Sequence, residues 1–402
     1  MPRLADHIST VPMSGIRRLF EVALRMDDVT VLAVGEPDVA VAPHIAAAAC
    51  AAWERDDTDY APNGGIAKLR SAITEKLQRD NHFHADVEQV WVTVGATQAL
   101  YQAMTLLLGV GEEILVPDPG YTTFTMNARM IGAIPVPYPL RPETHHGTGP
   151  RGAHNLSHAD HPNDSPQSFL PDLTQLERLV TERTRAIILN SPSNPLGVVY
   201  PRAMIERLVD FAARHDLWII SDEVYEYFTY GRDHVSPASI DTDDRVFSVY
   251  SLSKTYAMTG VRVGYLVTPK GLGATMSTVQ EAAISCVAVP DQYAGLAAIT
   301  GPQDAVTSAS DKYRANLNAA TALLDSRGIG YARPQGAFYL WVDISYASEG
   351  DVAGWAEKFL LDTRIAVAPG SAFGRSGEGW IRVCVAVDRD DLMRGLAALP
   401  AP

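Results

Sequence analysis

Residues 246–265 read VFSVYSLSKTYAMTGVRVGY, and this stretch decides the fold class. An apolar run that predicts a strand, Val246 to Tyr250, stops directly before Ser251-Leu252-Ser253-Lys254. In open α/β sheets the binding sites lie at the carboxyl ends of the strands. A lone lysine is usually an exposed surface residue, but a lysine at this place predicts a functional amine.

The rest of the chain indicates an α/β fold, because apolar runs that predict strands alternate with apolar residues at helical spacing. Strands are expected at 29–34, 90–94, 113–116, 134–136, 186–189, 218–221 and 246–250, and helices at 14–26, 44–53, 67–79, 98–108, 121–131, 173–180 and 204–214. This is the pattern of a parallel sheet with helices on both faces. After Pro290 the pattern changes to long helices, with strands at 338–342, 365–368 and 380–385.

We therefore expect two domains, for which 402 residues with 47% hydrophobic content are sufficient. Residues 45–285 form the large α/β domain, residues 286–402 form a smaller α+β domain, and residues 1–44 pack with the smaller one. Residues 141–168 are rich in Pro, Gly, Asn, Asp and His and lack periodicity, which predicts a surface loop insertion. Five of the eleven histidines lie there, at positions 145, 146, 154, 158 and 161. A metal site is the alternative, but a solvated polar loop is favoured and no metal is expected.

Composition narrows the class of partner. A formal net charge of −14 disfavours nucleic acid and anionic membrane surfaces, so a small molecule is expected. Cys50, Cys286 and Cys384 are far apart and form no C-x-x-C pair, which argues against a disulfide framework or a zinc cluster. The N-terminus has no apolar signal core, and no run of about 18 apolar residues occurs. We expect a soluble protein of the cytoplasm.

Two motifs have the residue types that bind a phosphate group. Gly95-Ala96-Thr97 lies where a strand meets a helix N-terminus, whose free N–H groups favour an anion. Ser251 and Arg262 flank Lys254 with a hydroxyl and a guanidinium. The alternatives are small residues needed for tight packing, a turn serine and a solvated arginine.

Three further motifs follow apolar strands. Asp222 comes directly after strand 218–221 and Tyr225 follows three residues later, although a helix-capping acid and a packed tyrosine are the simpler interpretation. Asn194 lies in the rigid turn 190–197, where a plain β-turn is the alternative. Tyr121 follows Pro117-Asp118-Pro119-Gly120 and could stack on a ring, although such an aromatic is more often a core residue.

Arg382 stands alone in the apolar strand 380–385. A buried arginine is costly unless it binds a carboxylate. A substrate carboxylate and a structural ion pair are both consistent with it.

Together these residues meet the needs of pyridoxal phosphate chemistry, which are a Schiff-base amine, a phosphate cradle, a carboxylate on the ring nitrogen, a donor to O3′ and an anchor for the substrate carboxylate. In this interpretation Lys254 forms the Schiff base and then moves the proton of the substrate Cα.

The ordered set of motifs resembles the class I pyridoxal-phosphate aminotransferases of fold type I, particularly the aspartate and aromatic aminotransferases of bacteria and archaea. The resemblance covers nearly the whole chain. It rests on residues 14–17, 35–38, 60–65, 95–99, 190–197, 221–225, 251–265, 336–339, 369–374 and Arg382.

The resemblance implies a large domain with a mostly parallel seven-stranded sheet, a smaller α+β domain and a homodimer. The residues that it places at the cofactor are Tyr60, Gly95, Ala96, Thr97, Tyr121, Asn194, Asp222, Tyr225, Ser251, Ser253, Lys254 and Arg262. Among these, Lys254, Asp222 and Tyr225 would be catalytic, and Tyr60 would reach the phosphate in the partner subunit. The residues that it places at the substrate α-carboxylate are Gly35, Asn194 and Arg382. The substrates would be an amino acid and a 2-oxo acid.

The sequence departs from the family at two positions near these motifs. Thr97 stands where some aspartate-using relatives carry a lysine, so the resemblance does not support a dicarboxylate substrate. Val261 stands where a tryptophan is usual. Other carbanion chemistry on the same scaffold, such as that of a lyase, cyclase, oxidase or carbon–carbon bond-forming enzyme, is the alternative function. A non-catalytic sensor fused to a DNA-binding segment is a third possibility, but residues 1–13 are too few for such a segment.

Overall fold

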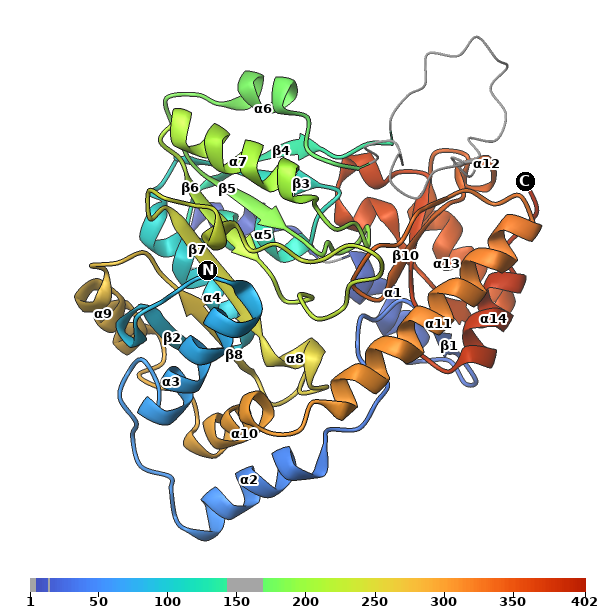
Figure 1. The fold of residues 1–402 in the computed structure, drawn as a ribbon. Helices are drawn as coiled ribbons and strands as arrows, with labels where there is room; N and C mark the ends of the chain where they lie inside the picture. The colour runs from blue at the N-terminus through green and yellow to red at the C-terminus, as the bar shows by residue number, and fades with distance from the viewer. Residues whose placement is uncertain (1–4, 14, 143–168) are drawn as a thin grey trace.

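The centre of the molecule is a seven-stranded sheet (Figure 1). The structure is a computed structural model, which describes residues 5–13, 15–142 and 169–402. The strands lie in the order β2-β8-β7-β6-β5-β3-β4. Their bounds are β2 (Val90–Val94), β3 (Glu113–Asp118), β4 (Ile134–Pro139), β5 (Thr184–Asn190), β6 (Trp218–Asp222), β7 (Val246–Ser251) and β8 (Val263–Val267). Neighbouring strands are parallel except at β8, which runs antiparallel to β2 and β7.

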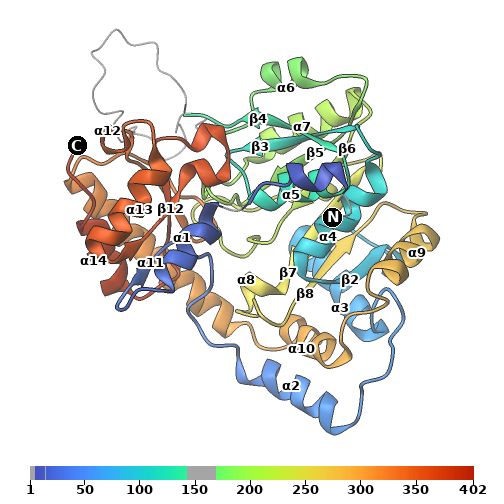
Figure 2. The ribbon, with the colours of Figure 1, turned by 180° about the vertical axis from the view of Figure 1, so that it is seen from behind.

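The strands are mostly apolar, as expected for a sheet with helices on both faces (Figures 1 and 2). Successive side chains of a strand point to opposite faces, so Ile187 and Ile188 of β5 belong to different core clusters. The cluster around Ile188 includes side chains of α4 (Gly95–Leu107) and α5 (Thr122–Met130). The cluster around Ile187 includes side chains of α7 (Arg202–Arg214).

A third cluster covers the β2–β8 end of the sheet and includes side chains of α2 (Pro43–Glu54), α3 (Ala67–Lys76) and α10 (Val289–Thr300). The helices α6 (Leu173–Leu179), α8 (Leu252–Thr255) and α9 (Gly273–Ala283) complete this part of the described chain.

The smaller part of the molecule is built on a second sheet with the order β12-β13-β10-β9, in which all pairs are antiparallel. Its strands are β9 (Tyr331–Ala332), β10 (Tyr339–Asp343), β12 (Ala368–Pro369) and β13 (Trp380–Cys384). The helices around it are α11 (Asp304–Ser326), α12 (Ser345–Ser348), α13 (Val352–Thr363) and α14 (Arg389–Ala397). Short helical turns lie at Asp6–Thr10, Leu77–Asn81, Val87–Gln89, Pro237–Ser239, Gly370–Phe373 and Arg375–Gly377.

The N-terminal segment contacts this smaller part. After α1 (Gly15–Ala23), strand β1 (Thr30–Val31) pairs in parallel with β11 (Ile365–Ala366). Figure 2 shows α1 between the two sheets.

The structure confirms the α/β class and the mostly parallel seven-stranded sheet. It also corrects local expectations. Strand β8 was missed, and the strand expected at 29–34 is limited to Thr30–Val31. The helix expected at 67–79 changes to a π-turn after Lys76, and the strand expected at 365–368 is split between β11 and β12. Among the described residues, no helix combines the length and apolarity needed to cross a bilayer.

The domain boundaries at residues 44 and 285 stay predictions. Helix α10, which follows the second boundary, packs against α2 and α3 of the large part. Most of the 141–168 insertion, with its five histidines, and Ser14 lie outside the described residues.

Candidate active site

A cavity of about 530 Å³ lies where the large sheet, the N-terminal segment and the small sheet meet. Strands β5, β6 and β7 end beside one another there, since Asn190 pairs with Asp222, and Asp222 pairs with Val249. The residues that line the cavity are Ile16, Glu21, Leu24, Val34, Gly35, Ala96, Thr97, Leu100, Tyr121, Asn194, Asp222, Val224, Tyr225, Ser251, Ser253, Lys254, Thr259, Arg262, Tyr339 and Arg382.

Lys254 is presented to the cavity by the short helix α8. Ser251 caps this helix, because its Oγ accepts a hydrogen bond from Ser253 N at 3.1 Å. The Nζ of Lys254 donates to the carbonyl oxygen of Gly35 at 2.8 Å. Burial lowers the pKa of Lys254 to about 8, with Arg382 among the further causes. An appreciable fraction of the amine is therefore neutral near pH 8 and can act as a nucleophile or base.

Asp222 ends β6 and is buried beneath the cavity. Burial raises its pKa to about 7, and the neighbouring Glu223 carboxylate adds to this, against a hydrogen bond from Val224 N and the charge of Lys254. No described cation forms an ion pair with Asp222. A buried carboxylate in this state fits a ligand that brings a protonated nitrogen.

Behind Asp222, Glu223 is fully buried and is held by three donors, which sequence reasoning missed. Its carboxylate lies 2.8 Å from His234 Nε2 and accepts hydrogen bonds from Ser236 Oγ and Tyr250 Oη, each at 3.0 Å. Its backbone N–H donates to Val249 O at 3.0 Å. These contacts fix the turn that presents Asp222.

The N-terminus of α4 and Arg262 form one wall of the cavity. Gly95 has a φ of +69°, and a Cβ there would lie 2.4 Å from an Nη of Arg262, so a glycine is required for the guanidinium to lie over the start of α4. Arg262 Nη1 donates to Thr259 O at 2.7 Å and lies 3.4 Å from Ser253 Oγ. A helix N-terminus, hydroxyls and a guanidinium are the groups that bind a phosphate.

Arg382 is 3% exposed within β13. Its Nη1 donates to Asn194 Oδ1 at 2.8 Å, and its Nη2 donates to Ala33 O at 2.5 Å. The ring of Tyr339 lies 4.3 Å from its guanidinium carbon. Its Nε is buried and has no hydrogen-bond partner among the described residues. A buried guanidinium with a free donor fits an incoming carboxylate.

Comparison with known proteins decides the family. The family model for aminotransferase class I and II matches residues 27–399. The chain belongs to the class I and II aminotransferases.

Individual relatives agree with this assignment. The aminotransferase is 34% identical to the aspartate aminotransferase of Pyrococcus abyssi over 394 residues, which are 97% of this chain and 95% of that protein. It is 33% identical to aromatic-amino-acid aminotransferase 2 of Thermococcus litoralis, again over 97% of this chain and 95% of that protein. A solved structure of Thermus thermophilus aspartate aminotransferase with maleate superimposes with a TM-score of 0.87 at 30% identity and covers 99% of both chains. The expected aminotransferase class, enzymatic function and fold are confirmed.

The structure brings most of the predicted site residues of the aminotransferase into the one cavity. Those that line it are Gly35, Ala96, Thr97, Tyr121, Asn194, Asp222, Tyr225, Ser251, Ser253, Lys254, Arg262 and Arg382. Gly95 lies behind this wall, beneath Arg262. Tyr60 does not line the cavity of its own chain and is 88% exposed.

Sequence reasoning assigned no site role to Tyr339 or to the wall made by α1. Tyr339 Oη lies 2.7 Å from Tyr225 Oη, and a Cβ on Gly35 would lie 2.0 Å from Tyr339 Oη. Ile16 and Leu24 come from the N-terminal segment. The only signal for Tyr339 was its place at the start of a strand, after Gly336-Ala337-Phe338.

Proposed function

We propose that this aminotransferase binds pyridoxal phosphate through Lys254 and transfers an amino group from an amino acid to a 2-oxo acid. One observation carries the proposal. Lys254, Arg262, Arg382 and the carboxylate of Asp222 line one cavity, and none of the four forms an ion pair with another described residue. Charged groups gathered in this way without partners need a ligand with complementary charges.

Pyridoxal phosphate fits these groups. Asp222 would face its ring nitrogen, Asn194 and Tyr225 would bond to O3′, and Tyr121 would stack on the ring. The phosphate would bind to the N–H groups of Ala96 and Thr97. The side chains that complete the phosphate site are Ser251, Ser253 and Arg262. When bound, the cofactor supplies an electron-withdrawing ring that stabilises negative charge at the substrate Cα.

The protein's own residues would then orient the substrate and move its proton. Arg382 would bind the α-carboxylate through its free Nε, while its bond to Asn194 keeps the guanidinium in place. The Nζ of Lys254 can take the proton from Cα, because its lowered pKa leaves part of the amine neutral. Buried Asp222, as a carboxylate, would hold the ring nitrogen protonated.

The homodimer belongs to the same proposal. Tyr60 is 88% exposed and does not line the cavity of its own chain, so its side chain is available to a second copy. An exposed tyrosine in this position supports a phosphate contact across a subunit interface, as the family resemblance implies.

Half-reactions on the purified holoenzyme test the proposal. A panel of amino acids is added without an acceptor, and the absorbance of bound pyridoxal phosphate is followed. We expect at least one amino acid to convert the cofactor to its pyridoxamine form, and a 2-oxo acid to restore it. Consumption of an amino acid without formation of the pyridoxamine form would instead indicate a lyase or another carbanion reaction, and would refute the transfer.

A further inference from the structure

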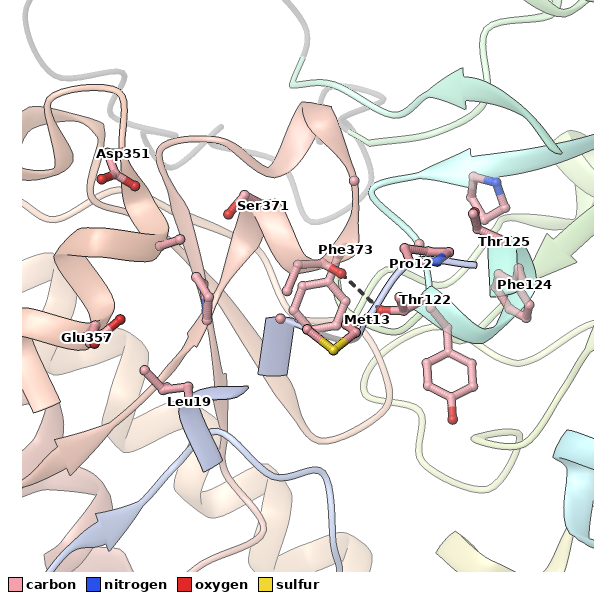
Figure 3. Close-up of a pocket in the computed structure, with 18 of the residues that line it drawn as sticks. Pro12, Met13, Leu19, Thr122, Phe124, Thr125, Asp351, Glu357, Ser371 and Phe373 are labelled. Atoms are coloured by element: carbon pink, nitrogen blue, oxygen red, sulfur yellow. Dashed lines mark hydrogen bonds between the residues drawn. The ribbon is translucent and has the colours of Figure 1, made fainter. Parts of the chain in front are cut away.

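The loop after β3, residues 118–122, is hydrogen-bonded to the small-sheet loop 371–376. The carboxylate of Asp118 accepts from Ser376 N at 3.1 Å and from Ser376 Oγ at 3.2 Å. Gly120 N donates to Phe373 O at 2.8 Å. Thr122 Oγ1 donates to Ala372 O at 3.0 Å, which is the dashed line in Figure 3. Four hydrogen bonds therefore join segments about 250 residues apart in the sequence.

The close approach of the two loops depends on a glycine. Gly374 has a φ of +135°, and a Cβ there would lie 2.0 Å from Asp118 Oδ1. Any side chain at 374 would push the carboxylate of Asp118 away from Ser376. Asp118 itself is 8% exposed, so its two hydrogen bonds are shielded from competing water.

Each loop carries a group of the active site. Tyr121, which lines the cavity, stands between Gly120 and Thr122, and both of these neighbours bond to the other loop. On the other side, the ring of Phe373 lies 4.8 Å from the guanidinium carbon of Arg382. The junction thus joins the residue proposed to stack on the cofactor to the residue proposed to bind the substrate carboxylate.

A second cavity, of about 540 Å³, opens beside this junction (Figure 3). It is lined by the N-terminal segment, including Met13 and Leu19, and by both loops. The two loops border open space on this side, so their mutual hydrogen bonds add to the packing of Phe373 in holding them in register.

We propose that Asp118 is a positioning residue, which through Ser376 fixes Tyr121 relative to Arg382 and so sets the distance between the cofactor ring and the substrate carboxylate. This inference rests on the proposed function of Tyr121 and Arg382. Asp118 does not line the active-site cavity, so it acts through the two loops.

The test compares Asp118→Ala and Ser376→Ala with the matched control Asp388→Ala in the same holoenzyme. Asp388 is an exposed carboxylate that also accepts two hydrogen bonds, from Asp390 N and Asp391 N, at the start of α14. The readouts are the KM and kcat for the donor found in the half-reactions, the Kd of pyridoxal phosphate for the apoenzyme, and the Tm.

We expect Asp118→Ala to raise the KM by about tenfold and the Kd of the cofactor by about threefold, with kcat changed less than KM, because misplaced binding groups weaken the bound state. Ser376→Ala keeps its N–H, so its KM should rise by about threefold. The KM and the cofactor Kd of the double variant should be no higher than those of Asp118→Ala, since both substitutions break the same link. Asp118→Asn should have a KM and a cofactor Kd close to those of the wild type, because its Oδ1 still accepts a hydrogen bond from Ser376 N.

Two results would overturn the inference. One is a KM and Kd of Asp118→Ala within about twofold of wild type while its Tm falls as in Asp388→Ala. If Asp118→Ala does not fold, the inference is overturned when Ser376→Ala has the KM of the wild type. The proposed function fails separately, when the wild-type protein binds no pyridoxal phosphate or reacts with no amino acid.

Discussion

Replacing Asp222 by asparagine should make the apoenzyme more stable, and increasingly so as the pH rises. Burial raises the pKa of Asp222 from 3.8 to about 7. Between these values the folded protein keeps a proton that the unfolded chain releases, so stability falls with rising pH by about 1.4 kcal/mol per pH unit. Asparagine does not titrate and escapes this loss. Its advantage over aspartate should grow by about 3 kcal/mol between pH 5 and pH 8.

The assay is urea unfolding of both apoproteins at pH 5 and pH 8, at one fixed protein concentration. Asp388→Asn is the control, because it makes the same replacement of a carboxylate by an amide at an exposed position. Addition of pyridoxal phosphate should abolish or reverse the advantage, since a ring cation then neutralises the aspartate. An Asp222→Asn advantage that is the same at both pH values would refute the reasoning that Asp222 is buried without a cation.

Four further substitutions probe the other groups. Lys254→Met should raise the free energy of unfolding of the apoenzyme by about 3 kcal/mol at pH 7, measured with urea. Burial lowers the pKa of Lys254 from 10.5 to about 8, so the charged amine destabilises the folded state at this pH. Equal stability of the two proteins would contradict this. Arg262→Gln should raise the Kd of pyridoxal phosphate by about tenfold or more in a fluorescence titration, since a charge-assisted bond is lost. Arg382→Lys should raise the donor KM by about 100-fold while cofactor affinity stays unchanged, because lysine lacks the planar fork; a parallel loss of cofactor would show that Arg382 is structural. Tyr60→Phe should weaken cofactor binding by a few-fold in a protein that is dimeric by native mass spectrometry, and an unchanged Kd would exclude the contact across subunits.

The sequence predicted the large sheet well because its parallel strands are buried on both faces and appear as short apolar runs. Strands β5 and β7 can be predicted from their own residues, without knowledge of the neighbouring strands. β8 is different, since Gly264 and Arg262 interrupt the apolar pattern at its start. The glycine is required by packing, as a Cβ at 264 would lie 2.6 Å from Tyr250 O. A requirement set by a neighbouring strand cannot be detected from local periodicity.

The candidate site likewise has residues that the local sequence pattern indicates and residues that depend on distant segments. Lys254, Asp222 and Asn194 could be singled out as candidates because each lies a few residues or less after an apolar strand, where α/β proteins place their binding groups. Tyr339 and Glu223 were not assigned, because their roles depend on contacts with segments far away in the chain. Glu223 is recognisable only from its donors, such as His234 and Tyr250. The link between Asp118 and Ser376 likewise exists only in the folded protein.

Borohydride reduction of the holoenzyme, followed by peptide mass mapping, tests the central claim most directly. Reduction makes the attachment of pyridoxal phosphate to an amine permanent, so the modified residue can be identified. We predict a single phosphopyridoxyl group on Lys254, and no such group when a reactive amino acid is added before reduction. A cofactor attached to another lysine, or modification of Lys254 that no amino acid prevents, would contradict the assignment of this cavity as the active site.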